Sequence, residues 1–181
     1  MSETGSAIAP PAPPPGVRLP AIVPPFLSRP TRPLVTLLLA YLTTILGSLM
    51  LAAIVQSFAP QAESPDFSQL SGVTALVALV LFAPLVETLI MGLFLSILLR
   101  FCAPATAIAI SAIGWGVAHS VQAATWGLVI WWPFLIFSTL YVVWKQRSLA
   151  WGLAMPFLVH AMQNSLPALA VAYPDRFAAL I

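Results

Sequence analysis

The sequence predicts an all-α fold: a polytopic membrane helix bundle of about five transmembrane helices after a disordered Pro-rich N-terminal tail. Composition is the first observation, because 60% of the 181 residues are hydrophobic and 7% are charged, unlike any ordinary soluble domain. The second is that charges and prolines divide the chain after residue 33 into apolar stretches near the roughly 20 residues that cross a bilayer. The third is that most cations would fall on one side of such a bundle.

The N-terminal segment, residues 1–33, differs from the rest in composition. It holds ten of the 18 prolines, several of them in the run at residues 10–15. A Pro-rich segment with little apolar surface favours an extended, polyproline-type or disordered conformation. We therefore expect a disordered cytoplasmic tail over residues 1–33 and a membrane domain over residues 34–181.

The five predicted helices follow one another as apolar runs, each bounded by polar or charged residues. The first ends before a polar loop that carries Glu63 and Asp66, and the second ends at Arg100. Pro84, inside the second run, either kinks that helix or splits it into two shorter ones. The predicted spans are residues 34–58, 73–99, 105–123, 126–144 and 149–173.

The placement of charges orients the spans. Five crossings put the acidic loop on one side and six cations on the other, which by the positive-inside rule is the cytoplasm. The N-terminus is then cytoplasmic, in a cell membrane of the bacterial cytoplasmic type. The net charge of +2 is too small and too scattered to indicate nucleic-acid binding. The six cations are Arg18, Arg29, Arg32, Arg100, Lys145 and Arg147.

Four polar residues inside the apolar spans are the candidate catalytic residues. Glu87 is the single carboxylate of the second span, and an ionisable group at that depth costs about 2.5 kcal/mol or more. The only two histidines, His119 and His160, also lie in spans, and Asn164 follows His160 by one helical turn. Because unpaired polar groups are costly in hydrocarbon, we expect the four side chains to line one cavity. There a carboxylate suits a general base, and imidazole and amide groups suit an oxyanion site.

Three segments that contain these residues carry a family resemblance. APLVETLIM (83–91), GWGVAHS (114–120) and VHAMQNS (159–165) resemble the motifs of the CPBP family, roughly EExxxR, FxxxH and HxxxN or HxxxD. That family comprises CAAX-processing and bacteriocin-immunity-type intramembrane endopeptidases, similar to the Ras-converting CAAX endopeptidase. The resemblance covers residues 73–173 and implies an intramembrane endopeptidase. It implies that Glu87 activates the water, that His119 is the FxxxH histidine, and that His160 and Asn164 help to hold water and oxyanion.

Two residues depart from the first motif. Thr88 replaces its second glutamate, and Gly92 replaces its arginine. Losing both members of an ion pair together leaves no charge stranded in the membrane. The departures favour a second interpretation, a catalytically weak or inactive relative that binds or protects a membrane partner. A small ion-coupled carrier is a third, although neither repeated halves nor paired broken helices occur in the sequence.

The same residues limit the cofactors and partners. We predict no cofactor, with zinc as the alternative, since carboxylate and histidine are zinc ligands. Asn164 is a poor zinc ligand, which leaves three donors. The expected partners are a membrane-associated protein or peptide substrate and the lipid bilayer, and no motif specifies an oligomeric state.

Overall fold

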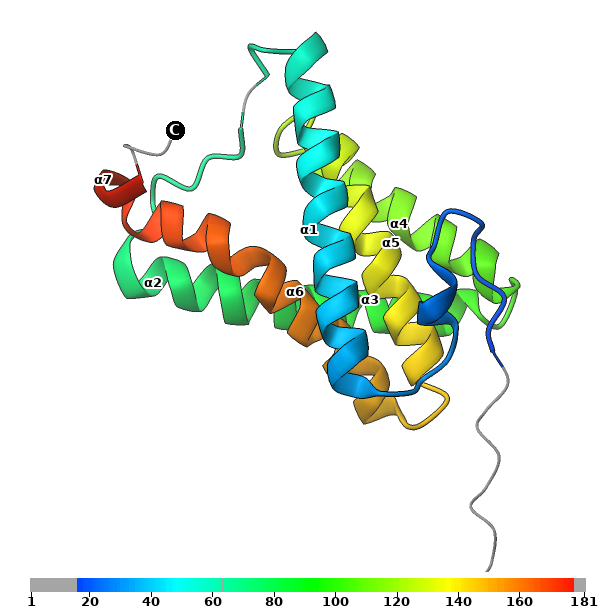
Figure 1. Ribbon diagram of the computed structural model, residues 1–181. Helices are drawn as coiled ribbons and strands as arrows, with labels where there is room; N and C mark the ends of the chain where they lie inside the picture. The colour runs from blue at the N-terminus through cyan, green and yellow to red at the C-terminus, as the bar shows by residue number, and fades with distance from the viewer. Residues whose placement is uncertain (1–15, 63, 178–181) are drawn as a thin grey trace, which may run out of the picture.

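The computed structural model describes residues 16–62 and 64–177, and helices are the regular elements found there (Figure 1). This confirms the predicted all-α fold, since the described residues contain no strand. The elements in chain order are the 3-10 turn η1 (Pro25–Ser28), α1 (Pro33–Phe58), α2 (Gly72–Leu76), the π-helical segment η2 (Val77–Phe82), α3 (Ala83–Leu98), α4 (Pro104–Ser120), α5 (Gly127–Trp144), α6 (Leu149–Ala172) and α7 (Pro174–Phe177).

All five predicted spans are helices whose ends lie within about three residues of the predicted ones. Three of them are long and apolar enough to cross a membrane: α1, the continuous α2–α3 helix and α5. The shorter α4, of 17 residues, and α6, which carries two internal prolines, complete the bundle. These are the features of a multi-pass membrane protein.

The second span is one helix with a local change of register, and Pro84 explains the change. The N–H of Ala83 bonds to the carbonyl of Ala78, five residues back, as in a π-helix. Proline has no N–H to donate, and its ring would clash with the carbonyl four residues before it in an α-helix. The wider π turn accommodates the proline without breaking the helix, so the span is not split.

The helix α5 forms the centre of the bundle. Every residue from Pro133 to Trp144 is buried, because α1, α4 and α6 pack around α5. In Figure 1 the α2–α3 helix crosses behind α1, and it packs along α6. Large apolar side chains on α1 and α3, such as Leu34, Leu46 and Leu93, are exposed on the outside of the bundle. Such faces suit contact with lipid.

Two glycines permit the closest helix contacts. At Gly47 of α1 a Cβ atom would overlap Nε1 of Trp132, whose indole N–H donates to the Thr43 carbonyl at 2.9 Å. At Gly127 a Cβ atom would overlap the backbone carbonyl oxygen of Gly116. Small residues let membrane helices approach closely, and these two fix α1 and α4 against α5.

The N-terminal segment differs from its prediction where the structure describes it. Residues 1–15 lie outside the described residues, but residues 16–32 pack against the bundle instead of forming a disordered tail. Leu27 is fully buried and Val23 is 4% exposed, both in the main apolar core. The N–H of Val17 donates to the Ser28 carbonyl at 2.9 Å. Apolar side chains between the prolines pack against α5, and the composition of this segment did not indicate such packing.

Candidate active site

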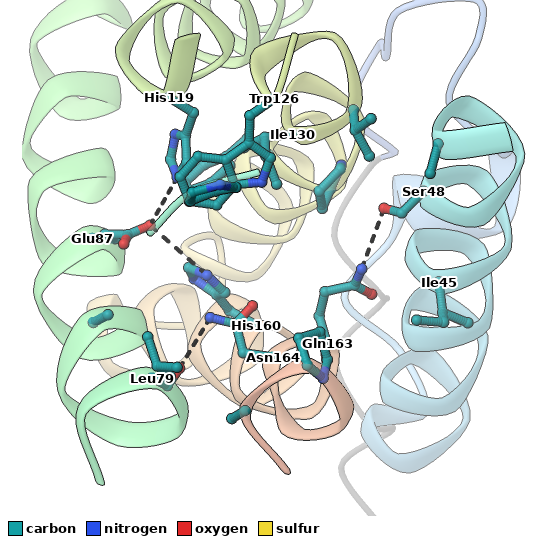
Figure 2. A pocket seen from close by; sticks show the side chains of 18 of the residues that line it. Ile45, Ser48, Leu79, Glu87, His119, Trp126, Ile130, His160, Gln163 and Asn164 are labelled. Carbon is teal, nitrogen blue, oxygen red and sulfur yellow. Dashed lines mark hydrogen bonds and ion pairs between the residues drawn. The ribbon is translucent and has the colours of Figure 1, made fainter. Parts of the chain in front are cut away.

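A cavity of about 540 Å³ lies inside the bundle, and all four predicted residues line it (Figure 2). Glu87 comes from α3, His119 from α4, and His160 and Asn164 from α6. The structure therefore brings together the residues that the sequence separates. The rest of the lining is mainly apolar and includes Ile45, Leu49, Ala52, Val129, Ile130, Pro133, Phe134, Phe137, Ala168 and Val171.

Glu87 and the two histidines form the centre of the site. Glu87 Oε2 lies 4.0 Å from His119 Nε2 and 3.8 Å from His160 Nε2. The Glu87 side chain is 24% exposed, whereas His119 and His160 are buried. Figure 2 shows the three side chains pointing toward one another from three different helices. The continuous α2–α3 helix with its π segment brings Glu87 level with His119, which lies at the end of α4.

The orientation of His119 is fixed by its own helix and by aromatic neighbours. Its Nδ1 lies 2.8 Å from the Trp115 carbonyl oxygen, so this nitrogen donates a hydrogen bond. In the neutral ring Nε2 then carries a lone pair, which faces Glu87. Trp126 meets the ring edge-on with centroids 4.7 Å apart, and Phe134 lies at 5.4 Å.

Aromatic side chains pack against the ring of His160. Its ring stacks on Phe137 at a centroid distance of 4.6 Å, and Phe134 meets it edge-on at 5.4 Å. The His160 Nδ1 atom is buried and has no hydrogen-bond partner among the described residues. Its Nε2 faces Glu87, so this nitrogen is the one that can exchange a proton with the site.

Asn164 has a contact that the motif did not predict. Its Nδ2 donates to the carbonyl oxygen of Leu79 at 3.0 Å (Figure 2). In the π register the residue that would donate to this carbonyl is Pro84, which has no N–H. Asn164 therefore satisfies a carbonyl that the proline leaves free, and it ties α6 to the helix that carries Glu87.

Gln163 and Ser48 line the cavity and were missed in the sequence. Gln163 Nε2 donates to Ser48 Oγ at 3.2 Å, which joins α6 to α1 across the cavity. Gln163 belongs to the segment VHAMQNS. Its polar side chain within an apolar span was the feature from which a place in the site could have been predicted. Ser48 gave no such signal, because small polar residues are common in membrane helices. Trp126, which contacts Phe67 of the loop before α2, was also missed.

The two departures from the first motif leave this cluster intact. Thr88 is 2% exposed, and its Oγ1 has no hydrogen-bond partner in the described part of the chain. A Cβ atom on Gly92 would lie 2.9 Å from Cε2 of Tyr141, so the tyrosine ring fills this space. The Tyr141 hydroxyl is 2.6 Å from Ser96 Oγ, to which Lys145 Nζ also donates at 2.9 Å. Tyr141 thus packs where a larger side chain at position 92 would project.

The candidate zinc ligands of the site are Glu87, His119 and His160. Within residues 16–62 and 64–177, no group of three or more His, Cys, Asp and Glu side chains is arranged to hold a metal ion. The Nδ2 atom of Asn164, next to these candidate ligands, donates to the Leu79 carbonyl.

Comparison with protein families identifies the chain. The family model described as type II CAAX prenyl endopeptidase Rce1-like matches residues 69–166, which is more than half of the 181 residues. The chain belongs to this Rce1-like family. The match includes Glu87, His119, His160 and Asn164, while α1 lies outside it. Neither the curated proteins nor the solved structures gave a significant match.

Membership in the Rce1-like family confirms the resemblance drawn from the three motifs. It also supports the predicted class of intramembrane protease, together with the three membrane-crossing helices.

Proposed function

We propose that this Rce1-like protein is an intramembrane endopeptidase that hydrolyses peptide bonds of membrane-associated substrates with a water molecule activated by Glu87. One observation carries the proposal: Glu87 Oε2 lies within 4.0 Å of the Nε2 atoms of both His119 and His160 in a single cavity. Ionisable groups in a membrane protein are expensive, and their convergence in a cavity is typical of a functional site.

The geometry suggests a role for each group. Glu87 takes a proton from the water while the water oxygen attacks the carbonyl carbon of the scissile bond. His119, whose Nε2 carries the lone pair, accepts a hydrogen bond from the other O–H of that water and holds the water in place. His160 donates from Nε2 to the oxyanion, since its Nδ1 has no acceptor among the described residues. The second N–H of Asn164 Nδ2 is available to the same oxyanion.

The second half of the reaction returns the proton. Glu87, now protonated, gives its proton to the leaving nitrogen as the C–N bond breaks. The products are a carboxylic acid and an amine, and one water is consumed without any cofactor. The aromatic residues around both imidazoles exclude water from the rings, which strengthens the electrostatic interactions in the site.

The substrate class follows from the cavity and from the family. The apolar lining from α1 and α5 suits an apolar chain beside the scissile peptide group. The family description names a CAAX prenyl endopeptidase, so the first substrate to test is a peptide with a prenylated C-terminal CAAX sequence. The proposed location is a cell membrane, with the N-terminus in the cytoplasm.

The direct test is cleavage of this peptide by the purified protein in lipid vesicles, with products identified by mass spectrometry. Glu87→Gln should give no product. Asp66→Asn is the matched control, because it makes the same carboxylate-to-amide change at an exposed loop residue.

A binding or protection role is the second candidate, and the observations that favour it are Thr88 and Gly92 in place of the motif glutamate and arginine. Full biological activity of Glu87→Gln would support this role instead of the peptidase.

A further inference from the structure

We infer that Gln163 positions the substrate by pairing its side-chain amide with a backbone peptide group close to the scissile bond. The inference rests on the proposed peptidase function and names a residue for which the family motifs give no role. It also gives α1, which lies outside the family match, a part in the site.

The first step is where Gln163 lies. Its side chain extends from α6 across the cavity toward α1, where Nε2 donates to Ser48 Oγ at 3.2 Å (Figure 2). Its Oε1 atom is buried and has no hydrogen-bond partner among the described residues. A buried acceptor without a donor is destabilising, so a ligand that brings an N–H to this oxygen gains binding energy.

The second step is the chemistry of that ligand. A glutamine amide has a donor and an acceptor side by side, and a peptide group offers the complementary C=O and N–H. The surrounding lining is apolar, with Ile45 and Leu49 from α1 and Ala168 from α6. This environment accepts apolar side chains and leaves the backbone as the polar partner. A hydrocarbon chain alone would leave Gln163 Oε1 without a donor.

The third step is the register. Gln163 follows His160 by three residues on α6, a rise of about 4.5 Å along the helix axis. An extended peptide advances about 3.3 Å per residue. A substrate lying along α6, with its scissile carbonyl at His160 and Glu87, therefore presents to Gln163 a peptide group one or two residues away.

The contact with Ser48 describes the protein without substrate. Binding exchanges the Ser48 hydroxyl for the peptide backbone, so the Gln163 amide is never without a partner for its N–H. Ser48 then occupies a supporting position, and the dependence of cleavage on the substrate N–H should persist when Ser48 is replaced.

The test uses a prenylated CAAX-type peptide in which each backbone amide except the scissile one is replaced, in turn, by an ester. The ester lacks the N–H. We expect one ester position to lower the kcat/KM of the unmodified protein about tenfold, as for loss of one hydrogen bond. Gln163→Met, which keeps length and loses both polar atoms, should lose about tenfold on the parent peptide and nothing further on that ester. Ser48→Ala should show the same ester sensitivity as the unmodified protein.

Two results would overturn the inference. One is that no single ester position weakens cleavage by the unmodified protein. The other is that Gln163→Met and the unmodified protein lose activity equally at every position, which assigns Gln163 a purely structural role.

Binding of the same peptides to the Glu87→Gln protein separates this inference from the proposed function. If one ester position weakens binding only when Gln163 is present, and the unmodified protein cleaves no peptide, the role of Gln163 is supported and the peptidase function is rejected. Cleavage without coupling would reject the role of Gln163 alone.

Discussion

Asn164 donates a hydrogen bond to the carbonyl of Leu79 at 3.0 Å, and this carbonyl is the one that Pro84 leaves without a backbone donor. This hydrogen bond joins the third motif segment, residues 159–165, to the π-helical turn that precedes the first motif segment, residues 83–91. Glu87 lies three residues after Pro84, so this hydrogen bond helps to set the position of the proposed base. Asn164 therefore has a structural contact in addition to its proposed place beside the oxyanion.

Glu87→Gln should abolish peptide cleavage while the protein stays folded. The amide is nearly isosteric with the carboxylate but cannot accept the proton of the water. Cleavage is measured by mass spectrometry and folding by thermal unfolding in detergent. Asp66→Asn should retain full activity. Cleavage by Glu87→Gln at the parent rate would rule out this residue as the base.

Asn164→Ala should lower the free energy of unfolding by about 1–3 kcal/mol, because it leaves the partly buried Leu79 carbonyl without a donor. In a Pro84→Ala background the loss should be smaller, since alanine restores an N–H and the Leu79 carbonyl regains a backbone donor. A double-mutant cycle by thermal unfolding should give a coupling of at least about 0.5 kcal/mol. Equal losses in both backgrounds would show that the two residues act independently.

Gly92→Ala should destabilise the protein by about 1–3 kcal/mol, as is usual for overpacking. Its Cβ would lie 2.9 Å from Tyr141 Cε2, and α3 and α5 would have to move apart. Thr88→Ala should have little effect on cleavage, because among the described residues the Thr88 hydroxyl forms no hydrogen bond with a proposed catalytic group. Unfolding curves and cleavage rates of the two variants check this. A fully stable Gly92→Ala protein would contradict the packing of Tyr141 against α3.

Reporter fusions should place the chain with its N-terminus and the turn at Gln146 in the cytoplasm and the loop at Ala62 outside. The reason is that five crossings put most cations on one side of the membrane. Fusions at Pro15, Gln146 and Ala62 to a reporter active in a single compartment measure this. The same compartment for Ala62 and Gln146 would contradict a five-span arrangement.

Removal of metal ions should leave peptide cleavage unchanged, because the proposed water activation uses Glu87, His119 and His160 alone. The measurement is the cleavage rate after dialysis against a chelator, with an untreated sample as the control. A loss of activity that zinc restores would instead identify a metallopeptidase.

The sequence by itself determined the helical class, the positions of the five long helices and the four polar residues at the site. Hydrophobicity and charge are local properties, so the span ends could be read from neighbouring residues. The convergence of Glu87 with His119 and His160 followed from the cost of leaving polar groups unpaired in lipid.

Only the tertiary structure decided which other residues join them. Ser48 and Gln163 are 115 residues apart in the sequence, and Leu79 and Asn164 are 85 apart, yet each pair is hydrogen-bonded. The reason is that helices from distant parts of the chain pack side by side. The path of residues 16–32 along the bundle likewise depends on packing against a distant helix, α5. Val23 and Leu27 are too few to predict a fold, yet the surface of α5 buries them. Contacts of this kind depend on the packing of whole helices, which no local pattern in the sequence describes.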